Sequence, residues 1–110
     1  MKVVRWDERA WQFSDEKMQK VGLFSSERFF LDLYCLEPRQ TQKAHAHDGS
    51  DKVYLVVEGS GRFRVGKDEV ALSPGECVLA ASGEVHGIVN DSDARLVVLT
   101  LMAPPPPPKG

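Results

Sequence analysis

The 110-residue sequence predicts an all-β protein, a sandwich or closed barrel of many short strands. Runs rich in β-branched and aromatic residues alternate with clusters of Gly, Pro, Asn, Asp or Ser roughly every ten residues. No stretch repeats its apolar residues with the period of an amphipathic helix. A chain of this length is expected to form one domain with a substantial core.

The composition indicates an ordinary compact domain. Hydrophobic residues make up 42% of the chain, charged residues 27%, and the formal net charge of -2 offers no basic face for nucleic acid. No apolar run approaches the roughly 20 residues of a membrane helix, and the amino terminus lacks the apolar segment of a signal peptide. Cys35 and Cys77 show no C-x-x-C spacing and are expected to be reduced. We therefore expect a cytoplasmic protein without nucleic-acid or membrane partners.

Residues 1–24 are expected to form an amino-terminal arm and a first strand. Trp6, Trp11 and Phe13 lie in the arm, and we expect their rings to pack over the barrel or over a partner subunit. The alternative is an aromatic lid over a ligand. Residues 14–18 carry a partial capping signal, which predicts one short helical turn.

The barrel itself is expected over residues 25–102, followed by a disordered, extended proline-rich tail over 103–110. Asp32 is the only charged residue inside its strand, and we expect it at the rim of the sheet or paired with a neighbour. A further strand is expected to contain His86. The other expected strands cover residues 28–36, 41–47, 52–58, 61–66, 70–72, 76–80 and 95–102.

The three histidines of the chain form the candidate metal site. His45 and His47 are two residues apart, so both imidazoles leave the same face of an extended strand. His86 lies in a second patterned stretch over residues 75–90. Neutral imidazole nitrogens suit transition metals, so three converging histidines predict one divalent ion, Zn, Ni, Mn, Fe or Cu. The alternative is that each histidine is a hydrogen-bonded core residue.

These two stretches resemble the sequence motifs of the cupin family. The second cupin motif reads G-x5-P-x-G-x2-H-x3-N. Gly75, Gly83, His86 and Asn90 match it, and Ala81 stands where proline is usual. The resemblance implies a small single-domain bacterial cupin, which folds as a double-stranded β-helix, or jelly-roll barrel.

The first cupin motif, G-x5-H-x-H-x3-4-E-x6-G, is matched less completely. His45, His47 and Gly59 match it, Arg39 stands at the leading glycine, and Lys52 stands at the glutamate that binds metal in the family. The resemblance therefore implies a metal bound by the three histidines of this chain without that glutamate.

A lysine at the glutamate position needs an explanation, because its charge would face a divalent cation. At about 5 Å and an effective dielectric near 20, the repulsion is on the order of 6 kcal/mol. We expect Lys52 to turn its ammonium out to the barrel mouth, with Asp51 as an outer-shell partner. The alternatives are a neutral Lys52 with a lowered pKa, or a one-residue bulge that makes Asp51 the fourth ligand. Tyr54, the only clear inward phenol near the metal, completes the candidate site-lining residues Asp51, Lys52 and Tyr54.

The strand over residues 52–58 has apolar residues on both faces. In the cupin register Lys52, Tyr54 and Val56 point inward, and the outward residues are Val53, Leu55 and Val57. A strand that is apolar on both faces is buried on both faces. Either the amino-terminal arm or a second subunit must cover it, and we expect a homodimer.

The cupin resemblance does not select one function, because cupins include dioxygenases, isomerases, decarboxylases, storage proteins and sensing domains. We expect a small metal-binding cupin that acts on or binds a small organic molecule in the barrel, as a metal-dependent oxygenase or isomerase. The alternative is a non-catalytic module that binds or senses a small ligand. Lys52 in place of the glutamate counts against the usual four-ligand enzyme site.

Overall fold

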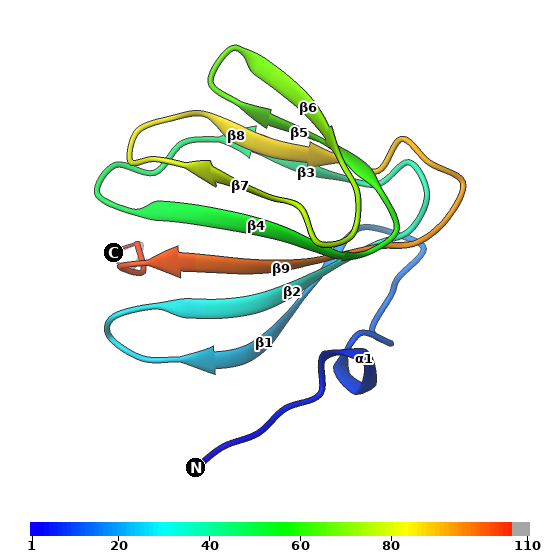
Figure 1. Ribbon diagram of the computed structural model, residues 1–110, viewed down its shortest axis with the longest axis horizontal. Helices are drawn as coiled ribbons and strands as arrows, with labels where there is room; N and C mark the ends of the chain where they lie inside the picture. The colour runs from blue at the N-terminus through cyan, green and yellow to red at the C-terminus, as the bar shows by residue number, and fades with distance from the viewer. Residues whose placement is uncertain (107–110) are drawn as a thin grey trace.

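The computed structural model describes residues 1–106 and consists almost entirely of antiparallel strands (Figure 1). Apart from one short helix at the amino terminus, the described elements are nine strands. In chain order they are α1 (Trp6–Arg9), β1 (Gln19–Ser25), β2 (Phe30–Leu36), β3 (Thr41–His45), β4 (Asp51–Glu58), β5 (Gly61–Val65), β6 (Asp68–Leu72), β7 (Cys77–Ala80), β8 (His86–Val89) and β9 (Leu96–Ala103).

The strands form two sheets that face each other (Figure 1). The first sheet has the order β1-β2-β9-β4-β7 and the second the order β3-β8-β5-β6. β1 and β2, and likewise β5 and β6, pair as consecutive strands, whereas the other neighbours come from distant parts of the chain. β9 lies between β2 and β4 and pairs with both. The arrangement confirms the predicted all-β jelly-roll class.

An apolar core fills the space between the sheets. Along β4 every second residue is buried, and Lys52, Tyr54 and Val56 point inward as predicted. This alternation follows from the two-residue period of an extended strand. The buried residues of this core are Tyr34, Leu36, Tyr54, Val56, Phe63, Leu72, Ile88, Leu96 and Val98.

The amino-terminal arm covers part of the outer face of the five-stranded sheet with Trp6 and Phe13, whereas Trp11, also expected to pack, keeps 75% of its surface exposed. Trp6, Phe13 and Val57 pack against a second buried cluster, which consists of Ala10, Val21, Leu33, Cys35 and Val97. Farther across the same sheet, Leu79 and Leu101 keep 55% and 38% of their surface exposed. The arm therefore covers only one half of this apolar face.

The predicted helical turn over residues 14–18 is wrong. Ser14 accepts a hydrogen bond from the N–H of Glu16, which closes a local turn and caps no helix. The one helix of the described residues is α1, whose first turn contains Asp7 and Glu8 near the positive end of the helix dipole. At four residues it falls far short of the length and apolarity that crossing a membrane requires.

Several strand ends also differ from the prediction. β3 ends at His45, so His47 lies outside the strand that was expected over residues 41–47. β6 starts at Asp68, because the turn after β5 uses only the two residues 66 and 67. β9 runs on to Ala103, and the carbonyl of Pro104 accepts a hydrogen bond of 2.7 Å from the Ser50 hydroxyl. The rest of the predicted tail, residues 107–110, lies outside the described part of the chain.

Candidate metal centre

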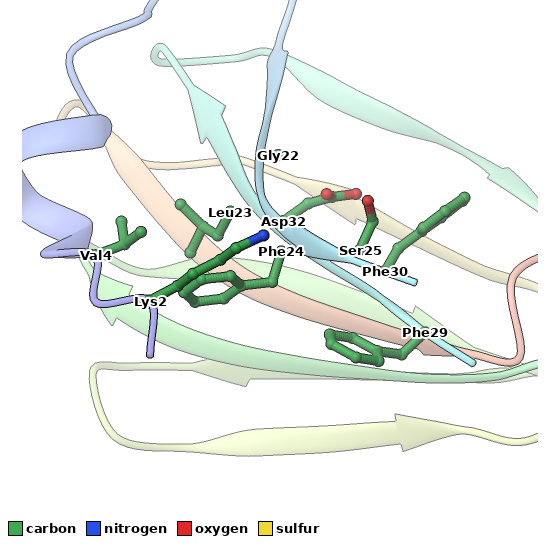
Figure 2. Close-up of a pocket in the computed structure, with 9 residues that line it drawn as sticks. All are labelled: Lys2, Val4, Gly22, Leu23, Phe24, Ser25, Phe29, Phe30 and Asp32. Carbon is green, nitrogen blue, oxygen red and sulfur yellow. The ribbon is translucent and has the colours of Figure 1, made fainter. Parts of the chain in front are cut away.

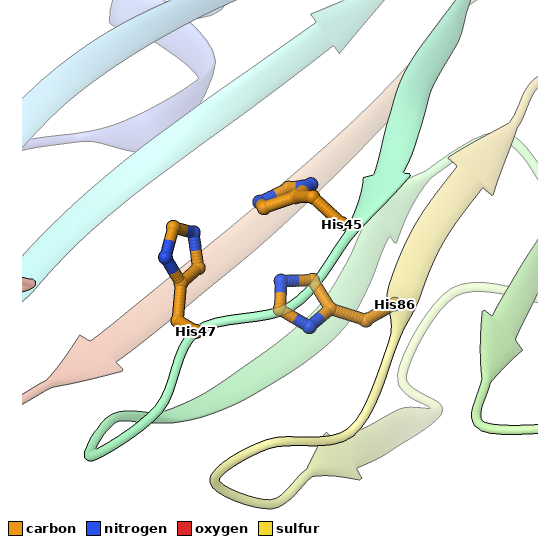
Figure 3. A group of neighbouring side chains, drawn as sticks. All are labelled: His45, His47 and His86. Atoms are coloured by element: carbon orange, nitrogen blue, oxygen red, sulfur yellow. The ribbon is translucent and has the colours of Figure 1, made fainter.

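The three histidines meet at one end of the barrel, where β3 ends and β8 begins (Figure 3). His45 and His86 are direct partners across these two strands, and His47 lies in the loop toward β4. Their ligand nitrogens all lie within 4.8 Å of one another. A zinc–imidazole bond is about 2.1 Å long, so small ring rotations would bring the three nitrogens onto one ion.

Backbone carbonyls determine which ring nitrogen of two histidines faces the site. Nδ1 of His45 lies 2.7 Å from the carbonyl of Lys43, and Nδ1 of His86 lies 3.0 Å from the carbonyl of Glu84. A carbonyl only accepts, so each Nδ1 carries the hydrogen and each Nε2 keeps its lone pair. Nε2 of His86 is buried and has no hydrogen-bond partner among residues 1–106. A buried, unpaired lone pair beside two further imidazoles fits a divalent transition metal.

Burial favours the neutral form of two of these imidazoles, His45 and His86. Burial lowers the pKa of His86 to about 4, and burial also lowers the pKa of His45. The neutral ring is the form that binds a metal, so both residues are available as ligands at neutral pH.

The two loops that carry His47 and His86 are joined by hydrogen bonds. The N–H of Gly83 donates to the carbonyl of His47 at 3.0 Å, and the N–H of Ser82 donates to the Asp51 carboxylate at 3.0 Å. Gly83 has φ +84°, a left-handed conformation that favours glycine. Asp51 is exposed and connects the loops rather than lining the site.

The matched motif residues farther from the metal have structural roles. Asn90 is fully buried, donates to the carbonyls of Leu36 and Ala94, and accepts two hydrogen bonds from Ser92. Arg39, at the position of the family's leading glycine, has φ 73°. This position therefore has the left-handed backbone conformation that glycine adopts readily, although the residue here is arginine.

Lys52 does not turn its ammonium out to the barrel mouth, and this expectation was wrong. The side chain is 1% exposed, and Nζ lies 5.0 Å from the ring centre of Tyr34 and 5.3 Å from that of Tyr54. β4 is paired with β7 on one edge and with β9 on the other, so the Lys52 side chain cannot leave the barrel past either edge. Inside the barrel, the faces of the two tyrosine rings attract its cation.

The structure supports the lowered pKa of the second explanation, although Lys52 still carries its charge below about pH 7. Burial lowers the pKa of Lys52 to about 7, the charge of Lys20 lowers it further, and Asp32 partly opposes the shift. The third explanation is wrong, because Asp51 pairs regularly with Ala103 and the irregularity of β4 lies farther on, after Val56.

Lys52 and two of the histidines, His45 and His47, line a common chamber of about 420 Å³. Tyr54 is not among the described lining residues: its hydroxyl donates to Gln42 at 2.6 Å, and it packs beneath the site near His86. The remaining lining residues are Lys20, Phe30, Asp32, Tyr34, Thr100, Met102 and Pro106.

Sequence reasoning missed several of these lining residues. Asp32 and Tyr34 lie on one face of β2, and Thr100 pairs with Asp32 on β9. The period-two pattern of each strand identified the shared face, but which face points into the chamber depends on the pairing with distant strands.

A larger open groove of about 760 Å³ lies elsewhere, between the amino-terminal segment and the β1–β2 hairpin (Figure 2). Lys2 and Val4 form one side, and Phe24 and Phe29 lie on the other. Asp32 lines both spaces, whereas His45 and His47 line the chamber and not the groove. We therefore place the chemistry in the smaller chamber.

Comparison with known proteins identifies the family of the chain. A cupin domain model matches residues 32–102, which contain all three histidines. Two solved structures superpose closely. The protein TT1209 from Thermus thermophilus has a TM-score of 0.94 and 42% identity, covering 96% of this chain and 100% of that chain. An RmlC-like cupin protein from Desulfovibrio desulfuricans has a TM-score of 0.84 and 26% identity, covering 96% and 98%.

A curated relative is similar over part of its length. The tetracenomycin polyketide synthase protein TcmJ from Streptomyces glaucescens is 32% identical over 75 residues, which are 68% of this chain and 50% of TcmJ. The present chain thus spans about half the length of that relative. The cupin model covers more than half of the chain and the jelly-roll fold agrees with it, so this protein belongs to the cupin family.

Proposed function

We propose that this cupin binds one divalent transition metal through His45, His47 and His86 and acts on a small organic molecule in the chamber. The observation that carries the proposal is the buried, unpartnered Nε2 of His86 beside two other imidazoles. A metal with three protein ligands keeps an open coordination position and supplies a Lewis acid to an oxygen atom of the substrate.

Of the two expected reaction classes, Asp32 favours an isomerase. It lines the chamber, and burial raises the pKa of its carboxyl group. A carboxyl group with a raised pKa is suited to take a proton from a substrate and return it near neutral pH. Proton transfer of this kind needs no oxidant.

The first experiment is metal analysis of the purified protein, followed by reloading with Zn, Ni, Mn, Fe or Cu. One equivalent of metal that is lost in a His86→Ala variant supports the site. Absence of stoichiometric metal after reloading with each of these metals would contradict the proposal.

The second experiment tests the reaction class. The metal-loaded protein is incubated in D₂O with small hydroxy-carbonyl compounds, and nuclear magnetic resonance (NMR) reports deuterium at the carbon next to the carbonyl. Isomerase chemistry predicts incorporation that falls at least tenfold in Asp32→Asn. Oxygen consumption without deuterium incorporation would identify an oxygenase instead.

A non-catalytic binding module is the second candidate function. The observation in its favour is Lys52, which stands where the family has a metal-binding glutamate. This candidate predicts a thermal shift with a bound ligand but no deuterium incorporation or oxygen consumption with any metal. TcmJ, a polyketide synthase protein, is in line with a small organic ligand in either case.

We also propose that the protein forms a homodimer through the part of the outer face that the arm leaves open. Val53 and Leu55 are half-buried there, and Leu79 and Leu101 are exposed. A stable interface would bury about 1,200 to 2,000 Å² in total. Light scattering at tens of micromolar should give the mass of a dimer, and Leu79→Asp should give a monomer. A monomeric mass for the unchanged protein would contradict this proposal.

A cytoplasmic location completes the proposal. Cys35 is buried and Cys77 is exposed, and both thiols are free. The cytoplasm keeps such thiols reduced. Thiol labelling in fractionated cells tests the location, and recovery of the protein outside the cytoplasmic fraction would contradict it.

A further inference from the structure

The wall of the chamber opposite the histidines is built from β1, β2, β9 and β4. Its inward residues form cross-strand rows: Lys52 pairs with Met102, and Thr100 pairs with both Tyr54 and Asp32. Lys52 and Thr100 are therefore diagonal neighbours on the same face, a separation of roughly 7 to 8 Å between backbones. A lysine side chain easily crosses such a distance.

Two buried polar residues of this wall, Lys52 and Thr100, face the chamber. The Thr100 hydroxyl is buried and has no hydrogen-bond partner among residues 1–106. The Lys52 ammonium is buried as well, and it contacts the rings of Tyr34 and Tyr54. A buried hydroxyl without a partner is costly, and a buried ammonium needs hydrogen-bond acceptors, so both groups are suited to a ligand that accepts hydrogen bonds.

The charged residues of the chamber indicate the sign of the charge on that ligand. The titratable residues that line it are Lys20, Asp32, Tyr34, His45, His47 and Lys52. Burial raises the pKa of Tyr34, which keeps this phenol neutral. Two ammonium groups thus face one carboxylate, and both lie within 5.3 Å of the Tyr34 ring centre. A divalent metal at the histidines would add further positive charge.

We propose that the ligand of this chamber is a small organic carboxylate, whose carboxylate group accepts hydrogen bonds from the Lys52 ammonium and the Thr100 hydroxyl. This inference rests on the proposed function, because it names the ligand class of the same chamber. Lys52 then has a reason to replace the family's glutamate: the position that normally binds the metal here selects the substrate. An anion between the two groups also relieves the cost of burying the lysine charge.

The test compares butanoate with butanamide, which have the same shape and differ in charge. Binding to the full chain is measured by calorimetry at pH 6.5 and low salt, once without metal and once after zinc loading. We expect butanoate to bind the metal-free protein at least tenfold more tightly than butanamide. Lys52→Met should abolish this preference, and Thr100→Val should weaken butanoate binding about threefold. Lys67→Met removes the same charge from an exposed turn outside the chamber and should behave like the unchanged protein.

A measurement on the unchanged protein covers the case in which a variant does not fold. The NMR signal of the Lys52 side-chain methylene next to the ammonium should shift with butanoate and stay in place with butanamide. Equal affinity for the two probes, or a preference that survives in Lys52→Met, would overturn the inference. Failure to bind zinc with the butanoate preference intact would overturn only the proposed metal, and zinc binding without that preference would overturn only the carboxylate.

Discussion

The two walls of the chamber differ in what they have in common with the family. The histidine wall, on β3, β8 and the loop after β3, carries the histidines that match the cupin motifs, with three nitrogen donors within 4.8 Å of one another. The opposite wall has Lys52 where the cupin motif has a glutamate, and Lys20 and Thr100 line the chamber beside it. The first wall is suited to a cation and the second to an anion. In this barrel the proposed metal site follows the cupin motifs, and the opposite wall departs from them at Lys52.

The largest expected effect tests the histidine wall. His86→Ala should lower zinc affinity at least 100-fold, about 2.7 kcal/mol, because it removes one of three ligands. Competition with a chelator of known affinity measures the loss. Circular dichroism of the metal-free variant provides the control for folding. Unchanged zinc affinity would mean that the histidines form a core cluster and no metal site.

The next effect tests the opposite wall, here called the lysine wall because it carries Lys52, through the pH dependence of stability. Lys52 has a pKa of about 7 in the folded protein and an ordinary value of 10.5 when unfolded. Between these values the unfolded chain binds more protons, so the free energy of unfolding rises with pH. We expect the metal-free protein to gain about 2 kcal/mol between pH 7 and pH 9.

Urea denaturation at a series of pH values measures this gain. Lys52→Met should lack it, and Lys67→Met, with its lysine exposed, should keep it. A gain of equal size in Lys52→Met would assign the pH dependence to another group.

Exchanging the charge of the second wall should convert it to the family pattern. Lys52→Glu is expected to tighten zinc or manganese binding at least tenfold, because it restores a carboxylate and removes a positive charge. Asp51→Ala should change the affinity little, because the Asp51 carboxylate accepts a hydrogen bond from the loop N–H of Ser82. Metal titration of both variants decides the point, and the reverse result would show that Asp51 is the ligand.

The smallest expected effect concerns the turn that leads into the histidine wall. Arg39 adopts φ 73° and forms an exposed ion pair of 2.6 Å with Asp93. Both Arg39→Ala and Arg39→Gly lose the pair, but only glycine relieves the backbone conformation. The glycine variant should therefore be about 1 kcal/mol more stable than the alanine variant in urea denaturation. Equal stabilities would show that the turn carries no strain.

The sequence predicted the histidine wall well, for a local reason. The spacing of His45 and His47, and the turn that precedes His86, are encoded by residues close to each ligand. The inward register of β4 could be read from the same strand, because a period of two leaves only two choices.

The lysine wall could not be predicted in the same way. The direction of the Lys52 ammonium depends on β7 and β9 closing both edges of β4, and on Tyr34, a residue of β2. The unpartnered hydroxyl of Thr100 is likewise visible only when β2, β4 and β9 lie together. These are contacts between segments far apart in the sequence, and no local pattern contains them.

The position of β9 also governs the order in which the molecule can assemble. β9 follows every other described strand in the chain, yet it lies between β2 and β4 at the centre of its sheet. During synthesis, β2 and β4 leave the ribosome well before β9 does. The edges of β2 and β4 that β9 will occupy therefore stay unpaired until β9 is available. Such late, long-range pairing slows folding and exposes edges to aggregation. The histidine strands β3 and β8 can pair while the opposite wall is still incomplete.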